Sequence, residues 1–384
     1  MCGVAFKIDN IEWMYFMNQP CGLYIHIPFC TGKCLYCDFY SKTGDSDEIN
    51  NYVVNMQRII QLYGEIYSSK TFDTIYIGGG TPSVIGTDNL ISIIEQASEH
   101  FNILPNTEIT IEMNPRSAQK IDFKKLADCG VNRISLGVQS ANENELKLLG
   151  RTHRNTDVKN AVNMIKNSGI DNISLDLMVG ISQQNEKSLI NSMDFCISQN
   201  PTHISAYILK VEENTPYKQL VPTLNLPDDD KQAELYTLMQ SYLEEKGYAQ
   251  YEISNFSKKG FESRHNLKYW NCDEYLGLGA SAHSLMNHNR FYFPRDIQDF
   301  YNNKKIDDGV GAISEEYIML RLRLTEGLIF KDYEKFFGSV PQKCIDIAKK
   351  YKAYGLTNIT ENGISLTKNG FLVSNSIIAE ILDS

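Results

Sequence analysis

Residues 24–39 read YIHIPFCTGKCLYCDF, and this stretch carries three closely spaced cysteines in a C-x3-C-x2-C pattern. The cysteines are Cys30, Cys34 and Cys37, and they follow an apolar run at residues 23–27 that is typical of a β-strand. Soft thiolates select zinc or iron–sulfur clusters. A structural zinc site usually has four protein ligands, whereas only three cysteines lie close together here, so we favour an iron–sulfur cluster.

Three thiolates on a cluster of four irons leave one iron without a protein ligand. Such an open iron can bind the amino and carboxylate groups of S-adenosylmethionine, and one electron from the cluster can then cleave the sulfonium bond to give a carbon radical. The sequence therefore predicts a [4Fe–4S] cluster and S-adenosylmethionine at Cys30, Cys34 and Cys37. A zinc site or a chance spacing stays open as an alternative, but the position of the motif between a strand and a helix favours the cluster.

Outward from this motif, strand-like runs alternate with helical patterns through the first half of the chain. The runs lie at residues 23–27, 74–77, 108–113, 133–139, 172–178 and 203–209. Helices are predicted between them at about residues 47–67, 117–130 and 156–169. This alternation predicts a parallel sheet with right-handed crossovers, and the near-continuous apolar character of the strands suggests burial on both faces. We therefore expect an α/β fold with a partial (β/α)6 barrel.

The run GGGTP at residues 78–82 directly follows the second predicted strand. Glycines at the carboxyl end of a strand let the backbone approach a ligand closely. The run is consistent with a clamp on the amino group of the ligand. A tight turn between strand and helix would explain it equally well, and the three glycines alone do not decide between the two.

Polar residues also stand near the ends of later strands. Glu112 and Gln139 end the third and fourth strands, Asp176 lies in the fifth, and Arg151 follows the fourth. The carboxyl ends of the strands form the active-site face of a βα barrel. An internal hydrogen bond would explain any one of these residues, but together with the cysteine motif they favour a ligand site.

The second half of the chain has a different pattern. Residues 216–313 are predicted to connect two domains, with a helix from about 228 to 245 and a strand at 251–256. A helical pattern begins at residue 314, a second covers 342–354, and the Asn362-Gly363 turn predicts a β-hairpin before a final helix from Gly370. The predicted domains are an N-terminal extension (1–21), the barrel (22–215), the connecting region (216–313) and a helical/β-hairpin, winged-helix-like domain (314–384).

The composition limits the classes of function. The chain has 37 Lys and Arg against 47 Asp and Glu, a net charge of −10, which argues against a nucleic-acid binder because phosphate needs a basic surface. There is no apolar run of about 18 residues and no basic leader that would indicate a secretion signal. Of nine cysteines, six lie outside the motif, as is common in a reducing compartment. We expect a cytoplasmic protein.

Several stretches together resemble the oxygen-independent coproporphyrinogen III oxidase-like group of radical-SAM proteins. The resemblance runs from about residue 22 to the C-terminus, and the stretches that carry it are YIHIPFCTGKCLYCDF (24–39), GGGTPS (78–83), NRISLGVQS (132–140), LGRTH (149–153) and SLDLMVGI (174–181). A departure is ISQQ at 181–184, where the group usually has a leucine-proline pair. The resemblance implies S-adenosylmethionine contacts at Tyr24, Tyr36, Gly80, Thr81, Glu112, Gln139, Arg151 and Asp176.

This group has two branches, which differ at position 39. The true oxidases typically carry a fourth cysteine two residues after the third and a longer N-terminal segment that helps to cover the substrate. Here Phe39 occupies that position, and only about 20 residues precede Leu23. CDFYS at 37–41 is similar to the other branch, the haem-chaperone (HemW-like) proteins.

RHNLKYW at 264–270 resembles the HNxxYW haem-binding motif of the haem-chaperone branch. The resemblance implies haem contacts at His265, Asn266, Tyr269 and Trp270. Neutral imidazole is a good axial ligand, the aromatic rings offer flat apolar surface, and Arg264 and Lys268 could meet the propionates. Alternatively, His265 makes a structural hydrogen bond and the aromatic rings pack in the core, in which case His283 is the next candidate ligand.

Three hypotheses for the function follow. The first is a haem chaperone that transfers haem to an acceptor protein, including a membrane-associated one, with reduced flavodoxin or ferredoxin as electron donor. The second is a radical-SAM oxidase or decarboxylase that acts on coproporphyrinogen III or a related tetrapyrrole. The third is a docking protein in which the cluster is a relic. The complete set of ligand-contacting positions disfavours the third, and Phe39 with the HNxxYW segment favours the first.

Overall fold

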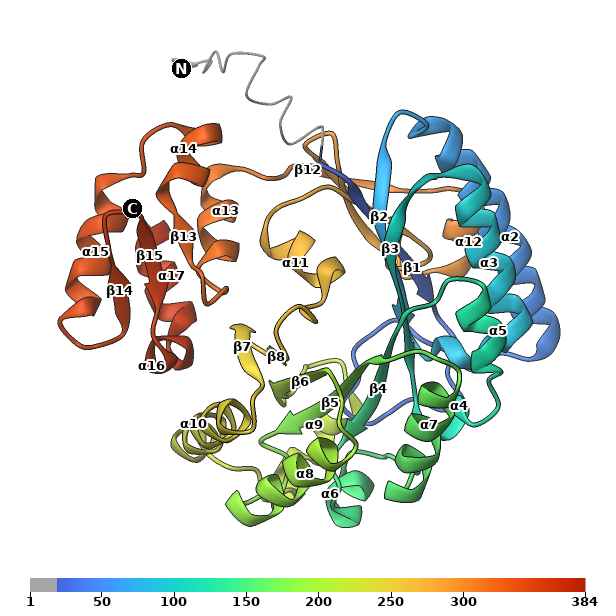
Figure 1. Cartoon of the computed structure of the whole chain (residues 1–384), viewed down its shortest axis with the longest axis horizontal. Coiled ribbons are helices and arrows are strands. Elements are labelled where there is room, and N and C mark those ends of the chain that lie inside the picture. Colours follow the sequence, from blue (N-terminus) through green and yellow to red (C-terminus); the bar gives the residue numbers. More distant parts are fainter. Residues whose placement is uncertain (1–18, 384) are drawn as a thin grey trace.

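A computed structural model describes residues 19–383, so the predicted N-terminal extension at 1–21 lies almost wholly outside the described residues. Six parallel strands form the centre of the structure, adjacent in sequence order as predicted, and helices cover their outer side (Figure 1). The strands are β1 (Cys21–Ile27), β2 (Thr71–Gly79), β3 (Asn102–Met113), β4 (Arg133–Gln139), β5 (Asn172–Val179) and β6 (His203–Ile208). The intervening helices are α2 (Ser46–Ile66), α3 (Thr87–His100), α4 (Pro115–Ala118), α5 (Phe123–Asp128), α6 (Glu143–Leu148), α7 (Asn155–Asn167) and α8 (Glu186–Ser198). The predicted partial (β/α)6 barrel is confirmed.

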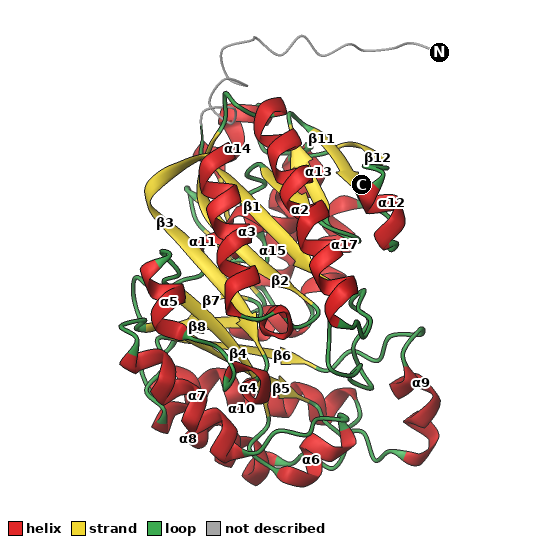
Figure 2. Ribbon diagram, turned by 90° about the vertical axis from the view of Figure 1, so that its right-hand side faces the viewer, coloured by secondary structure: helices red, strands yellow, loops and turns green. Residues whose placement is uncertain are grey.

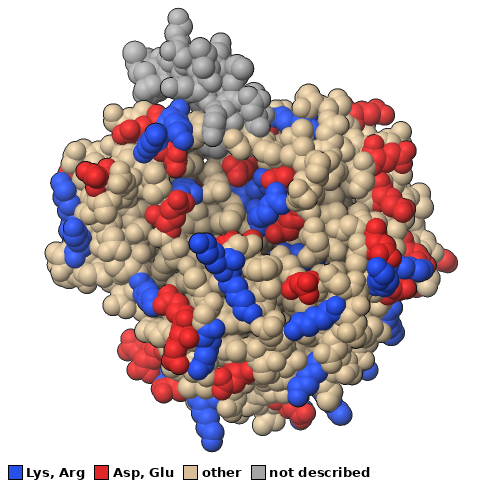
Figure 3. All heavy atoms as spheres, viewed as in Figure 1, with Lys and Arg blue, Asp and Glu red and all other residues tan. Residues whose placement is uncertain are grey.

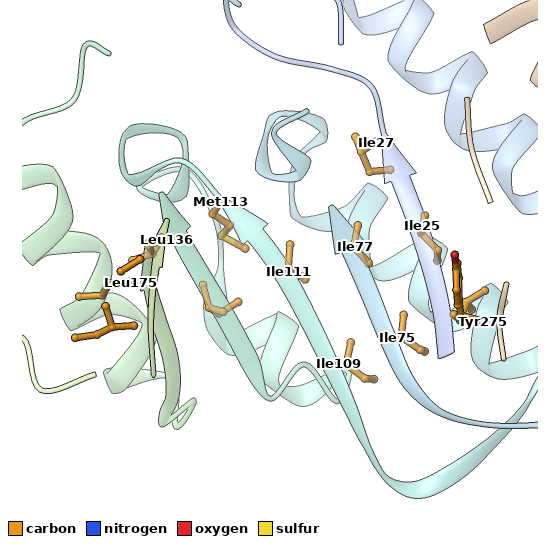
Figure 4. Close-up of a cluster of buried hydrophobic side chains, with 14 of the residues drawn as sticks. Ile25, Ile27, Ile75, Ile77, Ile109, Ile111, Met113, Leu136, Leu175 and Tyr275 are labelled. Carbon is orange, nitrogen blue, oxygen red and sulfur yellow. The ribbon is translucent and has the colours of Figure 1, made fainter. Parts of the chain in front are cut away.

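The two faces of this sheet differ in chemistry. Buried isoleucines and leucines of β1–β5 point to one side and form the core under the helices (Figure 4). The residues between them are polar and line a cavity on the other side: Tyr24, His26, Tyr76, Glu112, Arg133, Ser135, Ser174 and Asp176. The predicted burial on both faces is seen in the strands, of which β4 is buried at every residue, but the inner face is polar where the sequence pattern looked apolar. Period-two alternation places every second residue inward, where a polar cavity replaces a packed core.

The region from 216 to 313 extends the sheet at both ends and is more than a connection. Beyond β6 lies the antiparallel hairpin of β8 (Asn255–Ser257) and β7 (Ala249–Glu252), where we expected one strand at 251–256. Beyond β1 lie β9 (Tyr275–Leu278), β10 (His283–Met286), β11 (Asn289–Tyr292) and β12 (Ile306–Val310). The helices of this region are α9 (Pro216–Leu220), α10 (Asp229–Glu245), α11 (Arg264–Trp270) and α12 (Ile297–Tyr301). The helix α11 lies on the inner side of the arc of strands (Figure 1).

The helix predicted at 117–130 was also wrong in one respect, because the structure divides it. Its two parts are α4 and α5, and the Asp122 carboxylate accepts from the Lys125 N–H to start the second. By contrast, the helix expected at 156–169 is confirmed as α7, and the helix that ends at Glu245 is confirmed as α10.

The C-terminal part contains the predicted helices and hairpin, together with a third strand and a helix that the sequence pattern did not reveal. Its sheet has the order β13-β15-β14 and is antiparallel. The elements are α13 (Ser314–Arg321), β13 (Leu328–Ile329), α14 (Phe330–Phe337), α15 (Gln342–Lys352), β14 (Thr357–Ile359), β15 (Gly363–Leu366), α16 (Lys368–Leu372) and α17 (Ser374–Leu382).

The helices α2 and α3 of the barrel lie in front of the long strands in the turned view of Figure 2.

Two properties of the molecule bear on its partners. Basic and acidic side chains are interspersed over the face drawn in Figure 3. Within residues 19–383, no helix has the length and apolar character needed to cross a membrane.

Candidate functional site

A cavity of about 940 Å³ opens at the inner face of the barrel, near the upper end of the ~300–1,000 Å³ range that is typical of ligand pockets. The three motif cysteines line it, and so do all eight residues for which the sequence predicted S-adenosylmethionine contacts. These are Tyr24, Cys30, Cys34, Tyr36, Cys37, Gly80, Thr81, Glu112, Gln139, Arg151 and Asp176. The structure thus brings together residues that come from β1 to β5 and from the loops that follow them.

The cysteines lie in the loop of residues 28–45 between β1 and α2, which we call the cysteine loop. All three thiols are free and partly exposed, and Cys30 Sγ lies 3.4 Å from the hydroxyl of Thr81. Among the described residues, no three His, Cys, Asp or Glu side chains converge closely enough to hold a single metal ion. Thiolates that bind different irons of one cluster need no such convergence, so the arrangement is compatible with the predicted cluster.

The glycine run packs the end of β2 against the cysteine loop. The Gly80 N–H donates to the Ile27 carbonyl at 2.8 Å, and the Thr81 N–H donates to the Phe29 carbonyl at the same distance. A Cβ atom at Gly80 would lie only 2.7 Å from the Phe29 carbonyl oxygen. This close approach explains why position 80 needs glycine. The role of Gly80 and Thr81 in holding a ligand stays a prediction.

Two partly buried carboxyl groups face the cavity. Glu112 accepts from the Tyr76 hydroxyl at 2.7 Å and from the Gly79 N–H at 3.2 Å, and desolvation raises its pKa. Asp176 accepts from the Ser135 hydroxyl at 2.9 Å. Desolvation, together with the nearby charge of Glu112, raises the pKa of Asp176 to about 7. Both groups can accept hydrogen bonds from hydroxyl and amino groups of a bound ligand.

Two further side chains, at the end of β4 and after it, hold other parts of the cavity lining, Arg151 the cysteine loop and Gln139 the strand β6. Arg151 donates to the Tyr36 hydroxyl at 2.6 Å, while its buried Nε has no hydrogen-bond partner among the described residues. Gln139 has a φ of +65° and accepts from the Tyr207 hydroxyl at 2.9 Å. A left-handed conformation is strained for glutamine, and such strain is common at functional sites.

The HNxxYW segment forms α11, and its residues have different environments. Asn266 and Tyr269 line the cavity, whereas His265 is fully buried beside it. The Nδ1 and Nε2 atoms of His265 make 2.8 Å hydrogen bonds to Thr74 and Tyr269, and desolvation lowers its pKa to about 3. In this arrangement His265 offers no free nitrogen to haem iron. Its environment matches the structural alternative, while the haem contact itself stays a prediction.

The other residues of α11 also lie away from the cavity lining. Arg264 and Lys268, which we expected to meet the propionates, both form ion pairs with Asp73, at 2.9 Å and 2.7 Å. Trp270 is partly exposed and does not line the cavity. The Glu108 carboxylate accepts from the backbone N–H groups of Arg264 and His265, which anchors the start of the helix to β3.

Sequence reasoning missed several residues that line the cavity. Arg133 is buried at the start of β4, and its Nε and Nη1 have no hydrogen-bond partner among the described residues. A charged residue within a buried strand is the signal that could have identified it, as it identified Glu112. Asp38 and Arg295 form an ion pair at 3.0 Å at the edge of the cavity. Because the two residues lie far apart in the chain, no local sequence pattern predicts this contact.

Two family models match the chain. The radical SAM superfamily model matches residues 24–196, which contain the three motif cysteines and the whole predicted set of S-adenosylmethionine contacts. The HemN C-terminal domain model matches residues 312–373, which form most of the C-terminal part.

Curated relatives match over nearly the full length. The heme chaperone HemW of Haemophilus influenzae is 33% identical over 378 residues, which cover 94% of this chain and 97% of the relative. The heme chaperone HemW of Bacillus subtilis is 33% identical over 386 residues, covering 94% and 98%. Among solved structures, the coproporphyrinogen III oxidase HemN from Escherichia coli superposes with a TM-score of 0.82 at 18% identity, over 96% of this chain and 92% of that one.

Proposed function

Because this chain belongs to the HemW family within the radical SAM superfamily, we propose that it is a haem chaperone. In this proposal it binds haem, a [4Fe–4S] cluster and S-adenosylmethionine, and it transfers the haem to an acceptor protein. The observation that carries the proposal is the single cavity at which the motif cysteines, the predicted S-adenosylmethionine contacts and two residues of the HNxxYW segment meet.

Cys30, Cys34 and Cys37 would hold the cluster, which when bound supplies one-electron chemistry to S-adenosylmethionine at its open iron. The free state of the three thiols and their position at the cavity fit this role. Around them the chain supplies a partly buried cation in Arg151 and a partly buried carboxyl in Glu112, which suit a ligand that carries both a carboxylate and an amino group.

A radical enzyme that acts on coproporphyrinogen is the competing function. The likeness to the oxidase from Escherichia coli, at 18% identity, shows the fold alone. The residue at position 39 argues for the chaperone, because Phe39 stands where the oxidases typically carry a cysteine and its side chain is 66% exposed at the cavity. We propose a cytoplasmic location, with a one-electron donor such as flavodoxin or ferredoxin and an acceptor that includes membrane-associated haem proteins.

An anaerobic assay distinguishes the two functions. The reconstituted protein is incubated with coproporphyrinogen III, S-adenosylmethionine and a one-electron reductant, and protoporphyrinogen is measured after oxidation. We expect no product above the level of the Cys34→Ala variant, which serves as the matched control. Product formation that depends on Cys34 would overturn the chaperone proposal and establish the oxidase.

A further inference from the structure

Histidines surround the cavity, but most of them have no free ring nitrogen. His26 and His203 line the cavity, and His265 lies directly behind it. Each of these three rings uses both nitrogens in hydrogen bonds of 2.8 to 3.0 Å. The partners are Tyr24 and the Tyr40 carbonyl for His26, Ser174 and Tyr251 for His203, and Thr74 and Tyr269 for His265. None of them can ligate a metal without losing an existing bond.

His283 differs from the other three. It is the first residue of β10, lines the same cavity and is exposed. Neither of its ring nitrogens has a hydrogen bond to any residue within 19–383, and the ring stacks on Tyr292 with a centroid distance of 4.9 Å. Stacking fixes the ring plane and leaves the nitrogens accessible. Partial desolvation, with the charges of Arg290 and Arg295, lowers the pKa of His283 against the opposing charge of Asp308, and this favours the neutral imidazole that binds iron.

The surroundings of His283 suit a flat apolar molecule with carboxylates. Phe39 lines the same cavity and is 66% exposed, although large apolar side chains are usually covered. Its neighbour Asp38 pairs with Arg295, whose charge also acts on His283, so the cysteine loop and the start of β10 meet at one edge of the cavity. Arg295 is half exposed and has further N–H groups beyond those that it donates to Asp38.

We propose that haem binds at this edge of the cavity, with His283 as the axial ligand of its iron. In this inference, which rests on the proposed function, the ring of Phe39 packs against the porphyrin face and Arg295 receives a propionate. The imidazole donates a lone pair to the iron. The haem then lies beside the cysteine loop, at an exposed position from which an acceptor protein can remove it.

The test compares haem binding by full-length, cluster-reconstituted variants through visible absorbance. His283→Ala should shift the Soret band and weaken haem binding at least about tenfold. Mutations of residues that only support a metal ligand already cause losses of about this size, so loss of the ligand itself should cost at least as much. Added imidazole should restore the wild-type spectrum, because it replaces the missing ligand. His100→Ala, on the outer helix α3, is the matched control and should bind haem like the wild type.

His265→Gln distinguishes His283 from His265 as the ligand of the haem iron. We expect a normal Soret band from this variant, since His265 already uses both nitrogens within the fold. Unchanged binding and spectrum in His283→Ala would overturn the inference while the haem chaperone proposal stands, and loss of the band in His265→Gln alone would assign the ligand to α11. Failure of the wild type to bind haem would instead overturn the proposed function.

Discussion

Arg151 and Tyr36 are joined by a 2.6 Å hydrogen bond between the guanidinium Nη2 and the phenol oxygen, across 115 positions of the sequence. The contact ties the segment after α6 to the cysteine loop. The pKa of Tyr36 is raised to about 12, chiefly by burial, so the phenol stays neutral and the charge of Arg151 is not cancelled. The Nε of Arg151 is buried without a hydrogen-bond partner among the described residues, which leaves this partly buried cation ready for an anionic group of a ligand.

Replacing Arg151 by glutamine should therefore weaken the binding of S-adenosylmethionine. Loss of one charge-assisted hydrogen bond costs about 1.5–3 kcal/mol, or roughly 10- to 150-fold in affinity. Isothermal titration of the reconstituted protein measures the effect. The matched control is Arg116→Gln, because Arg116 is exposed and does not line the cavity. Equal weakening in both variants would show that Arg151 has no specific contact with the ligand.

The assignment of the cluster ligands predicts a clear pattern among cysteine variants. Anaerobic reconstitution of the wild type should give about four irons and four sulfides per chain. Cys30→Ala, Cys34→Ala and Cys37→Ala should each abolish the cluster absorbance. Cys129→Ala and Cys272→Ala should keep it, since neither residue lines the cavity. A cluster that survives in the motif variants but is lost in either control would move the ligands elsewhere.

The packing of the glycine run against the cysteine loop predicts that Gly80→Ala is damaging. The new Cβ would meet two backbone carbonyl oxygens at 2.7 and 2.9 Å, and backbone cannot move aside as a flexible side chain can. Thermal unfolding should show a loss of about 1–3 kcal/mol, together with poorer cluster retention. Gly32→Ala, within the cysteine motif, has no heavy atom within 4 Å of its new Cβ and should be neutral. Equal midpoints for the two variants would contradict this account.

The raised pKa of Asp176 predicts a pH dependence of stability. The unfolded side chain releases its proton near pH 4, whereas the folded one keeps it until about pH 7. Between these values the folded state binds more protons, so the free energy of unfolding contributed by Asp176 falls as the pH rises. Asp176→Asn should remove this loss.

The measurement is the free energy of unfolding of the cluster-free protein at pH 4.5 and pH 8. At pH 8 the free energy of unfolding of Asp176→Asn should exceed that of the wild type by on the order of 2–4 kcal/mol, and the difference should shrink toward zero at pH 4.5. Asp128→Asn, at a mostly exposed side chain, should show no such dependence. A difference that is the same at both pH values would mean that Asp176 does not titrate in this range.

Much of the barrel could be predicted from the sequence, because strand runs and helix caps are local signals. The run at 133–139 matches β4 to the residue, and the eight positions that the family resemblance implied as S-adenosylmethionine contacts all line the cavity. Their convergence follows from the rule that parallel strands share one carboxyl edge.

The rest depends on contacts that no local pattern contains. The six strands beyond β1 and β6 join the barrel through the pairing of β9 with β1 and of β8 with β6, which link residues far apart in the chain, so residues 216–313 looked like a connection. The Nδ1 of His265 is occupied by a hydrogen bond with Thr74, which lies 191 positions earlier. The motif HNxxYW therefore suggested an iron ligand, while His283, in a glycine-rich stretch without a motif, carried only a weak signal.

The central claim is that this protein carries haem. Its most direct test is a titration of haem into the anaerobically reconstituted wild type with S-adenosylmethionine present, followed by absorbance in the Soret region. The account predicts a saturable band that persists after gel filtration and that is transferred from the protein when an apo-haem protein is added. A titration that never saturates, or haem that separates from the protein on gel filtration, would contradict the account.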